Sequence, residues 1–189
     1  FLDQPQSMAI DLSRDLLVVG NNAAESDDSV ASISLIDLSG LNASTEATPG
    51  LYASDTELID GSVLPAAVSG EDDYTLSLSG RVSVALYEDY LYVGDYSEGT
   101  MVVLDIGDPS APSFVRALVD DNDGVESLGS VAALEVDSDR ALLFSTATGD
   151  EDAVTIFDLS DPSAPLAISE MVFGTTTTAF DLLYDPVSV

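Results

Sequence analysis

Carboxylates are the side chains with which this chain could do chemistry. The sequence holds 35 aspartates and glutamates against four basic residues, which are all arginines, and it has no histidine or cysteine. A Ser-His-Asp triad, a thiol nucleophile, a Schiff base, a P-loop lysine and a histidine-based zinc site are excluded, because each needs a residue that is missing. The carboxylates are left with two kinds of chemistry: binding of a hard cation, and acid–base work by a pair of acids.

The densest acidic run, residues 120–126, predicts a calcium site, since Ca²⁺ takes about six to eight oxygen ligands. The candidate ligands are Asp120, Asn122, Asp123 and Glu126. The run is not an EF-hand loop, because placing Gly124 at the sixth position puts Val119 and Ser130 at the first and twelfth. The alternative interpretation is a solvated acidic turn that holds no metal.

A pair of acids could instead hydrolyse a glycosidic bond, which requires two carboxylates about 5–9.5 Å apart. So many acids produce pairs by chance, and no pair is singled out. A carbohydrate partner would also suit a cluster of tyrosines, although tyrosines in strands more often serve packing. The cluster consists of Tyr87, Tyr90, Tyr92 and Tyr96.

The net charge of −31 argues against nucleic acid and anionic membrane surfaces as partners, since both need a basic footprint. No apolar run approaches the roughly 18 residues of a membrane helix, so membrane insertion is not expected. Cations are the natural partners, because molar salt shortens the Debye length to about 3 Å and makes self-repulsion tolerable. The composition is typical of halophile proteins, or of acidic proteins secreted into calcium-rich water. The sequon Asn42-Ala-Ser44 has meaning only in a secreted chain.

A repeated nine-residue stretch organises the chain. Residues 104–112 (LDIGDPSAP) recur at 157–165 (FDLSDPSAP), and a shorter copy lies at 36–40 (IDLSG). Each copy is an apolar strand that ends in an aspartate, which can accept backbone N–H bonds in the following turn. We therefore expect the aspartates of the motif to be structural turn residues. They are Asp37, Asp105, Asp108, Asp158 and Asp161.

Short apolar or alternating runs around this motif predict strands, and no long stretch has a helical period. The predicted strands are 7–12, 16–20, 31–37, one near 51–59, 82–86, 90–94, 100–105, 113–119, 131–136, 140–144, 153–158 and 166–172. Acidic hairpins follow the second strand of each repeat, the third of them at 146–152, and we expect their acids to line one solvated rim. These acids are Glu25, Asp27, Asp28, Asp95, Glu98, Asp150, Glu151 and Asp152.

Four strands joined by short turns, and then repeated, predict an all-β fold built of four-stranded antiparallel β-propeller blades. The first strands align at Met8, Val84, Ala132 and Ala179, with spacings of 76, 48 and 47 residues, so the repeat is about 47 residues long. We expect a single partial propeller over residues 1–189. Its parts are blade 1 at about 8–60 with an insertion at 41–80, blade 2 at about 82–120, blade 3 at about 130–173, and a partial blade at 174–189.

Three blades and a part cannot close a ring, since propellers have about four to eight blades. The start without a methionine is typical of a processed chain or an excised domain. We favour a fragment of a longer protein, because the last copy of the repeat ends after about one strand. Two alternatives are completion of the ring by another copy, and a degenerate fourth blade formed by the insertion.

Residues 90–94 (YLYVG) and 103–112 (VLDIGDPSAP) resemble the LVIVD-repeat family of β-propellers. Repeats of that family have a Tyr-x-Tyr-Val-Ala/Gly strand, a short hairpin, a Val-x-Asp strand and an Asp-Pro-Ser-x-Pro turn. Residues 156–165 match in their second half only. The resemblance covers about 82–173 and, more weakly, 8–40, and it implies a propeller that is secreted or on the cell surface, without implying a particular activity.

The predicted function is therefore a non-enzymatic extracellular or cell-surface module for binding or structure, within a larger surface protein or assembly. Its expected partners are cations, and other protein subunits or further blades of the same chain. Calcium is the candidate cofactor. The alternative is a carboxylate-based carbohydrate-active enzyme resembling the glycoside hydrolases with a propeller fold.

Overall fold

Twelve β-strands and no helix make up the residues that the computed structural model describes. These are residues 4–22, 31–39, 50–53, 78, 80–97, 99–121, 124–148 and 152–173. In this described part of the chain, no helix could span a membrane.

The strands form three four-stranded sheets, each antiparallel and in chain order. The first sheet contains β1 (Pro5–Asp11), β2 (Leu16–Asn21), β3 (Ser32–Asp37) and β4 (Gly50–Ala53). The second contains β5 (Val82–Tyr87), β6 (Tyr90–Asp95), β7 (Thr100–Asp105) and β8 (Ser113–Val119). The third contains β9 (Ser130–Asp137), β10 (Leu142–Thr148), β11 (Ala153–Asp158) and β12 (Leu166–Val172). The predicted all-β class with four-stranded antiparallel sheets is confirmed.

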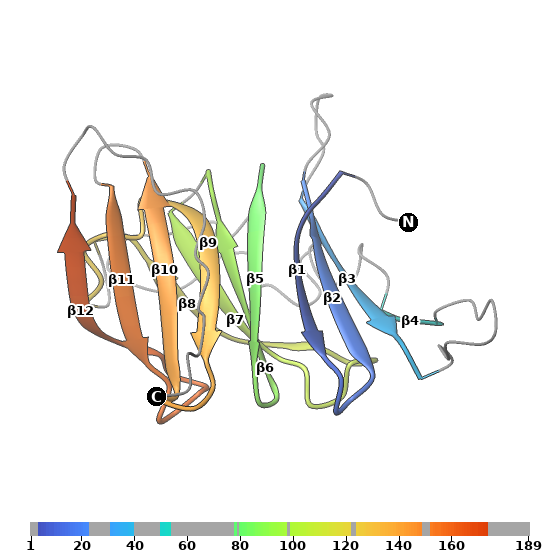
Figure 1. The fold of residues 1–189 in the computed structure, drawn as a ribbon. Helices are drawn as coiled ribbons and strands as arrows, with labels where there is room; N and C mark the ends of the chain where they lie inside the picture. Colours follow the sequence, from blue (N-terminus) through green and yellow to red (C-terminus); the bar gives the residue numbers. More distant parts are fainter. Residues whose placement is uncertain are drawn as a thin grey trace, which may run out of the picture.

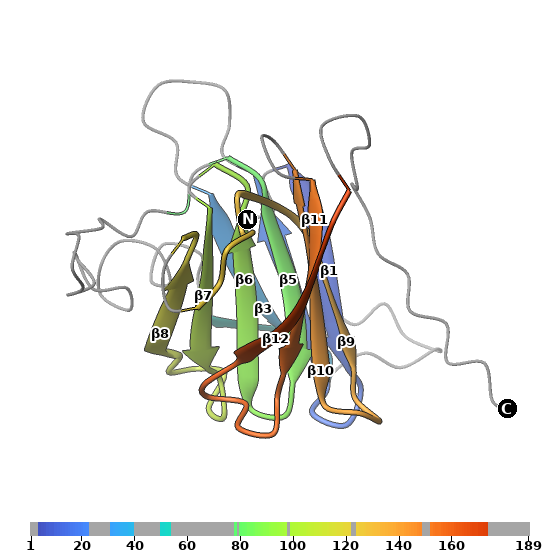
Figure 2. The ribbon, with the colours of Figure 1, turned by 90° about the vertical axis from the view of Figure 1, so that its left-hand side faces the viewer.

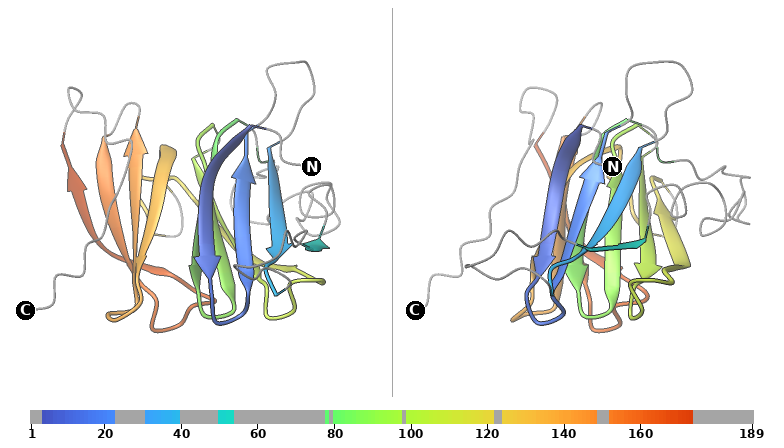
Figure 3. Two further views of the ribbon diagram at one scale, coloured as in Figure 1. Left: turned by 45° about the vertical axis from the view of Figure 1, so that its right-hand side comes forward. Right: turned by 90° about the vertical axis from the view of Figure 1, so that its right-hand side faces the viewer.

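The sheets stand beside one another in chain order, with the second between the first and the third (Figure 1). Their first strands are neighbours, because β5 contacts β1 on one side and β9 on the other. The sheets diverge towards their last strands, so that they form a fan (Figure 3). Figure 2 views this fan from the side of the third sheet, with β12 crossing in front.

Two apolar layers hold the fan together. We call the face of a sheet that contacts the next sheet its forward face, and the opposite face its backward face. The layer between the first and second sheets contains Leu16, Val18, Ile33, Leu35, Val82, Val84, Leu91, Val93, Val102 and Leu104. The layer between the second and third sheets contains Ala85, Tyr92, Met101, Val103, Leu118, Val131, Leu134, Leu143 and Phe157.

The second sheet is covered on both faces, and this explains the unbroken apolar runs in its central strands β6 and β7. Successive side chains of a strand point to opposite faces. In β6, Leu91 and Val93 enter the first layer and Tyr92 enters the second, and all three are fully buried. The sequence of a strand that is covered on both sides is a continuous apolar run, whereas apolar and polar residues alternate in a strand with one face in solvent.

Two glycines on the second strands allow the sheets to approach closely. Gly20 and Gly94 hold equivalent places, each one residue before the end of its strand. A Cβ on Gly20 would lie 2.9 Å from Val82 Cγ2, and one on Gly94 would collide with the Val131 side chain. In β10 the equivalent residue is Thr146. Thr146 pairs with Val154 and Gly94 pairs with Met101, and each of these partners lies four residues before the motif aspartate of its sheet.

Two serines join the first strands of neighbouring sheets. Ser7 and Ser83 are the partners of the two glycines in the strand pairs β1–β2 and β5–β6. The Ser7 hydroxyl donates to the Val82 carbonyl over 2.8 Å, and the Leu134 N–H donates to the Ser83 hydroxyl oxygen over 2.8 Å. The serines of β1 and β5 thus each tie their strand to the first strand of the next sheet.

The structure corrects one strand of the third sheet. We predicted a strand at 140–144 and a hairpin from residue 146, but β10 runs over Leu142–Thr148. Arg140 belongs to the preceding turn, because its N–H donates to Asp137 Oδ1 over 3.1 Å, and Ala141 there has a φ of 53°. The strand predicted near 51–59 is β4 (Gly50–Ala53) as far as the structure describes it. Most of the 41–80 insertion and the partial blade at 174–189 lie outside the described residues.

Candidate functional site

The motif aspartates close the turn after the third strand of each sheet. In each case Oδ1 accepts a hydrogen bond from the backbone N–H two residues further on. The bonds are Ser39 to Asp37 at 2.7 Å, Gly107 to Asp105 at 2.8 Å, and Ser160 to Asp158 at 2.8 Å. The same geometry in three sheets indicates that these carboxylates shape the chain.

Asp108 and Asp161 organise the proline turns of the second and third sheets in one way. The Oδ1 of Asp108 accepts from the Ser110 N–H at 3.0 Å and the Ser110 hydroxyl at 2.6 Å. Asp161 accepts from Ser163 in the same manner, at 3.1 and 2.6 Å. The Ser110 hydroxyl, and then its N–H, lower the pKa of Asp108 below the ordinary value. The Asp108 carboxylate therefore stays charged while it holds its turn.

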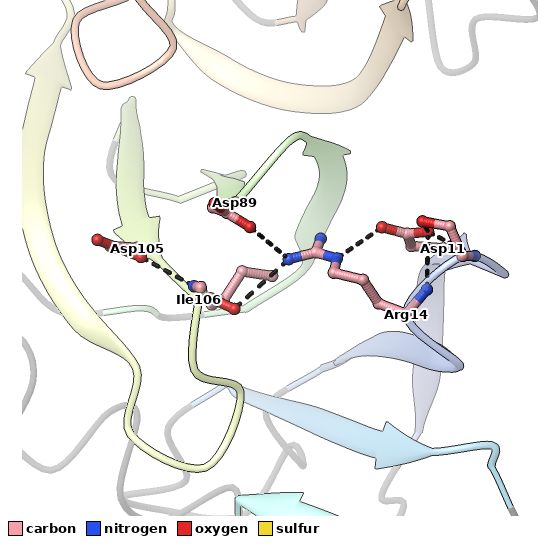
Figure 4. A network of polar contacts seen from close by, with 7 residues as sticks. Asp11, Arg14, Asp89, Asp105 and Ile106 are labelled. Atoms are coloured by element: carbon pink, nitrogen blue, oxygen red, sulfur yellow. Dashed lines mark hydrogen bonds and ion pairs between the residues drawn. The ribbon is translucent and has the colours of Figure 1, made fainter.

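Arg14 connects the first sheet to the second (Figure 4). Its Nε donates to Asp11 Oδ2 at 2.6 Å within the β1–β2 turn. Its Nη1 reaches Asp89 Oδ1 at 3.3 Å in the β5–β6 turn and the Ile106 carbonyl at 3.5 Å after β7. The hydrogen bond from the Ser13 hydroxyl is the largest cause that lowers the pKa of Asp11 to about 2, and Arg14 adds to it.

The third sheet repeats this Asp–Arg turn, and the described residues form no further sheet after it. Asp137 Oδ1 accepts from the Arg140 N–H, and Arg140 Nη1 donates to Asp137 Oδ2 at 3.1 Å. The Arg140 side chain is 68% exposed, against 22% for Arg14. Two turns of one design thus differ in whether the guanidinium bridges to a neighbouring sheet.

The predicted calcium loop is described only in part. Asp120 Oδ1 accepts from the Leu128 N–H at 2.6 Å, and the Glu126 N–H donates to Glu170 Oε1 at 3.0 Å. The other two candidate ligands, Asn122 and Asp123, lie outside the described residues. Across the residues that are described, no three acids are grouped closely enough to hold a metal ion. The calcium site stays a prediction.

The expectation of a solvated rim is wrong for two of the hairpin acids. Asp95 and Asp152 are both buried. Asp95 Oδ1 accepts from the Ser97 N–H at 2.7 Å, and Asp95 pairs with Thr100 across the hairpin. Because this carboxylate folds back onto its own turn, it is removed from water. The remaining acids of that set lie outside the described residues.

Tyr92 links the second sheet to the proline turn of the third. Its ring is fully buried, and its hydroxyl donates to the Pro162 carbonyl at 2.9 Å. Burial raises the pKa of the phenol above its ordinary value. Tyr87 and Tyr90 pack against the same apolar layer. These three tyrosines therefore serve packing, as most strand tyrosines do.

A groove follows the first strands β1, β5 and β9. One part, of about 400 Å³, is lined by Ser7, Arg81, Ser83 and Glu135 among others. The adjoining part, of about 340 Å³, is more apolar and includes Met8 and Ile10. The Arg81 guanidinium carbon lies 5.4 Å from the centre of the Tyr96 ring, a cation–π contact. Opposite charges and hydroxyls in one groove could bind a polar ligand.

The contacts between sheets were not predicted from the sequence. The Asp-x-x-Arg spacing at residues 11–14 and 137–140 was a signal for the paired turns, because it recurs at the same place in two repeats. No local signal identified Asp89 or the Ile106 carbonyl as the distant partners of Arg14, since their contact depends on how the sheets pack.

Asp11→Asn removes the ion pair with Arg14. We expect it to lower the free energy of unfolding near neutral pH. The expected loss is on the order of 1–2 kcal/mol, because the ion pair is only partly buried. The folded pKa of Asp11, about 2, is below its unfolded value of 3.8. The stabilisation is therefore present above pH about 4 and is lost as the pH falls towards about 2. Urea unfolding of both proteins across this range measures it.

Asp139→Asn is the matched control, because Asp139 is an exposed acid in the corresponding turn of the third sheet, and we expect less than about 0.5 kcal/mol. A difference between Asp11→Asn and the original chain that stays constant down to pH about 2 would contradict the assignment.

The comparison with curated proteins finds no match for the chain. The comparison with protein families finds one at the second sheet, where residues 81–119 match the family model described as the LVIVD repeat. The resemblance found in the sequence is confirmed there. Sheet β5–β8, with the residue before it, is thus the part of this chain that matches the LVIVD repeat.

Proposed function

We propose that the three sheets are blades of a β-propeller, and that this propeller is a non-enzymatic binding or structural module. The observation that carries the proposal is the arrangement of the three sheets. Each is a four-stranded meander, the sheets stack in chain order with their first strands adjacent, and the middle sheet matches the LVIVD repeat. Propeller blades are arranged in this way around a central channel. Three sheets are fewer than the roughly four to eight of a closed ring.

The first strands would then line the channel, and the groove along them is the proposed binding surface. It combines Arg81, Glu135 and two serines with the apolar side chains of β1. The carboxylates of the motif are occupied as acceptors in turns, which favours a structural use of these acids over a catalytic one.

The proposed setting is extracellular or cell-surface, in a medium rich in salt or calcium. The net charge of −31 destabilises a folded chain through self-repulsion, and cations relieve this repulsion by screening. Acids placed at strand ends and turns, such as Asp105, Asp108 and Asp161, lie where mobile cations can reach them without entering an apolar layer.

Thermal unfolding tests the salt adaptation. Between about 0.05 M and about 2 M NaCl we expect Tm to rise by on the order of 10 °C, since each kcal/mol shifts Tm by about 2–4 °C for a chain of this size. Sucrose is the control, because it strengthens burial without screening charge. The same Tm in low and high salt would refute the salt adaptation. A Tm that falls when EDTA is added in high salt would point to a specific calcium site.

A screen for turnover tests the non-enzymatic part of the proposal. Aryl glycosides and acidic and neutral polysaccharides are incubated with the chain at high salt, and the release of aglycone or reducing ends is measured. We expect no release above a heat-denatured sample. Release that disappears when a specific pair of acids is changed to amides would establish the carbohydrate-active alternative.

A further inference from the structure

The groove along the first strands joins a charged part to a part with exposed apolar side chains. Its larger part, of about 400 Å³, includes Arg81 and Ser83, and the adjoining part, of about 340 Å³, includes Ile10. Met8 and Glu135 line both parts, so the two are continuous. A single ligand that lies along the groove would therefore meet a cation, an anion and apolar surface.

Arg81 offers its guanidinium to this groove. Within the described part of the chain, the arginines that pair with carboxylates are Arg14 and Arg140, although the whole chain has 35 acids. Arg81 is exposed and stacks on Tyr96 at 5.4 Å. Stacking orients the guanidinium, which can then donate two parallel N–H bonds to a carboxylate. Arg81 is thus placed to bind a carboxylate of a ligand.

Ser83 adds a second donor to the same part of the groove. Its oxygen accepts the Leu134 N–H at 2.8 Å, and the residue is only 7% exposed. A hydroxyl that accepts one hydrogen bond still has its own proton to donate. Among the described residues no acceptor for this proton is found. The Ser83 hydroxyl can therefore donate to the same carboxylate as Arg81.

Glu135 brings a negative charge to a position that is apolar in the second sheet. It holds the place of Ala85, because each lies two residues after the first-strand partner of Thr146 or Gly94. Ala85 is on the forward face of the second sheet, within the apolar layer. The fold does not need a carboxylate at this place. A carboxylate has about four acceptor sites, so Glu135 can accept an ammonium group in addition to any contact within the chain.

The net charge of −31 limits the ligands that suit this groove. The whole chain repels a purely anionic ligand, and a simple cation finds acids over much of the surface. A ligand with one ammonium and one carboxylate has no net charge and meets a partner of each sign in the groove. Met8 is 76% and Ile10 is 58% exposed, so such a ligand also has apolar surface to cover.

We infer that the groove binds a zwitterion with an apolar body, which is the chemistry of a hydrophobic amino acid or a short hydrophobic peptide. Its carboxylate would contact Arg81 and the Ser83 hydroxyl, and its ammonium would contact Glu135. Its apolar body would cover Met8 and Ile10. The inference rests on the proposed binding module, and it names the class of ligand for the groove of that module.

Isothermal titration calorimetry with leucine, trileucine and triglycine tests the inference at about 1 M NaCl, where general repulsion is screened. We expect trileucine to bind about tenfold more tightly than triglycine, because only trileucine covers the apolar part. Acetylating its amine or amidating its carboxylate should each weaken binding by about tenfold. Equal affinity for leucine would identify the free amino acid as a sufficient ligand, and tighter binding of trileucine would identify the peptide.

Two variants assign the charged contacts. Arg81→Gln should weaken the binding of trileucine by about tenfold and leave the binding of trileucine amide unchanged, because the amide has no carboxylate. Glu135→Gln should likewise affect trileucine and leave N-acetyl-trileucine unchanged. Arg140→Gln and Glu88→Gln are the matched controls, because they make the same changes at exposed turns, and both should bind like the original chain.

A chain that binds neither leucine nor trileucine at millimolar concentrations overturns the inference. A doubly capped trileucine that binds as tightly as the free peptide also overturns it, because recognition then does not use the two charges. The Tm of each variant shows whether it is folded. If no peptide binds but the original chain keeps its salt-dependent Tm and shows no turnover, only the ligand class is wrong and the proposed module stands.

Discussion

The fold depends on the packing of one apolar sheet face against the next. The second sheet is covered on both faces, so its central strands β6 and β7 carry unbroken apolar runs, and Leu91, Tyr92 and Val93 are fully buried. Several other contacts of the chain serve this packing. Gly20 and Gly94 clear space for the next sheet, Ser7 and Ser83 tie the first strands together, and Arg14 joins adjacent turns. The glycine and serine contacts occur at both junctions between sheets, whereas the Arg14 bridge joins the first sheet to the second.

This constraint also decides where the acids go. A carboxylate inside an apolar layer would have to be paired or neutralised, so the charge is concentrated at strand ends and turns. There an aspartate is useful, because its oxygen can accept the N–H bonds that a turn leaves unpaired. Asp37, Asp105 and Asp158 do this in three sheets with nearly the same geometry. The aspartates that shape the turns thus also contribute to the net charge of −31.

Local features of the fold could be predicted from the sequence, and distant ones could not. Strands such as β6 and β7 follow from apolar runs, and the turn aspartates follow from a repeated motif, because both depend on neighbouring residues. The bridge from Arg14 to Asp89, the bond from Tyr92 to Pro162 and the burial of Asp95 depend on how the sheets pack and on how a turn folds back. The end of β10 was predicted too early, because the threonines next to the acidic residues were assigned to the hairpin. Thr146 and Thr148 are instead buried within the strand.

Native-state hydrogen exchange tests most directly whether a doubly covered second sheet is the centre of this fold. Amides that open only on global unfolding exchange most slowly. The account predicts the slowest exchange in β6 and β7, which lie between two apolar layers, and much faster exchange in β1 and β12, whose exposed faces carry Met8 and Met171. Exchange in β6 that is as fast as in β12 would contradict it.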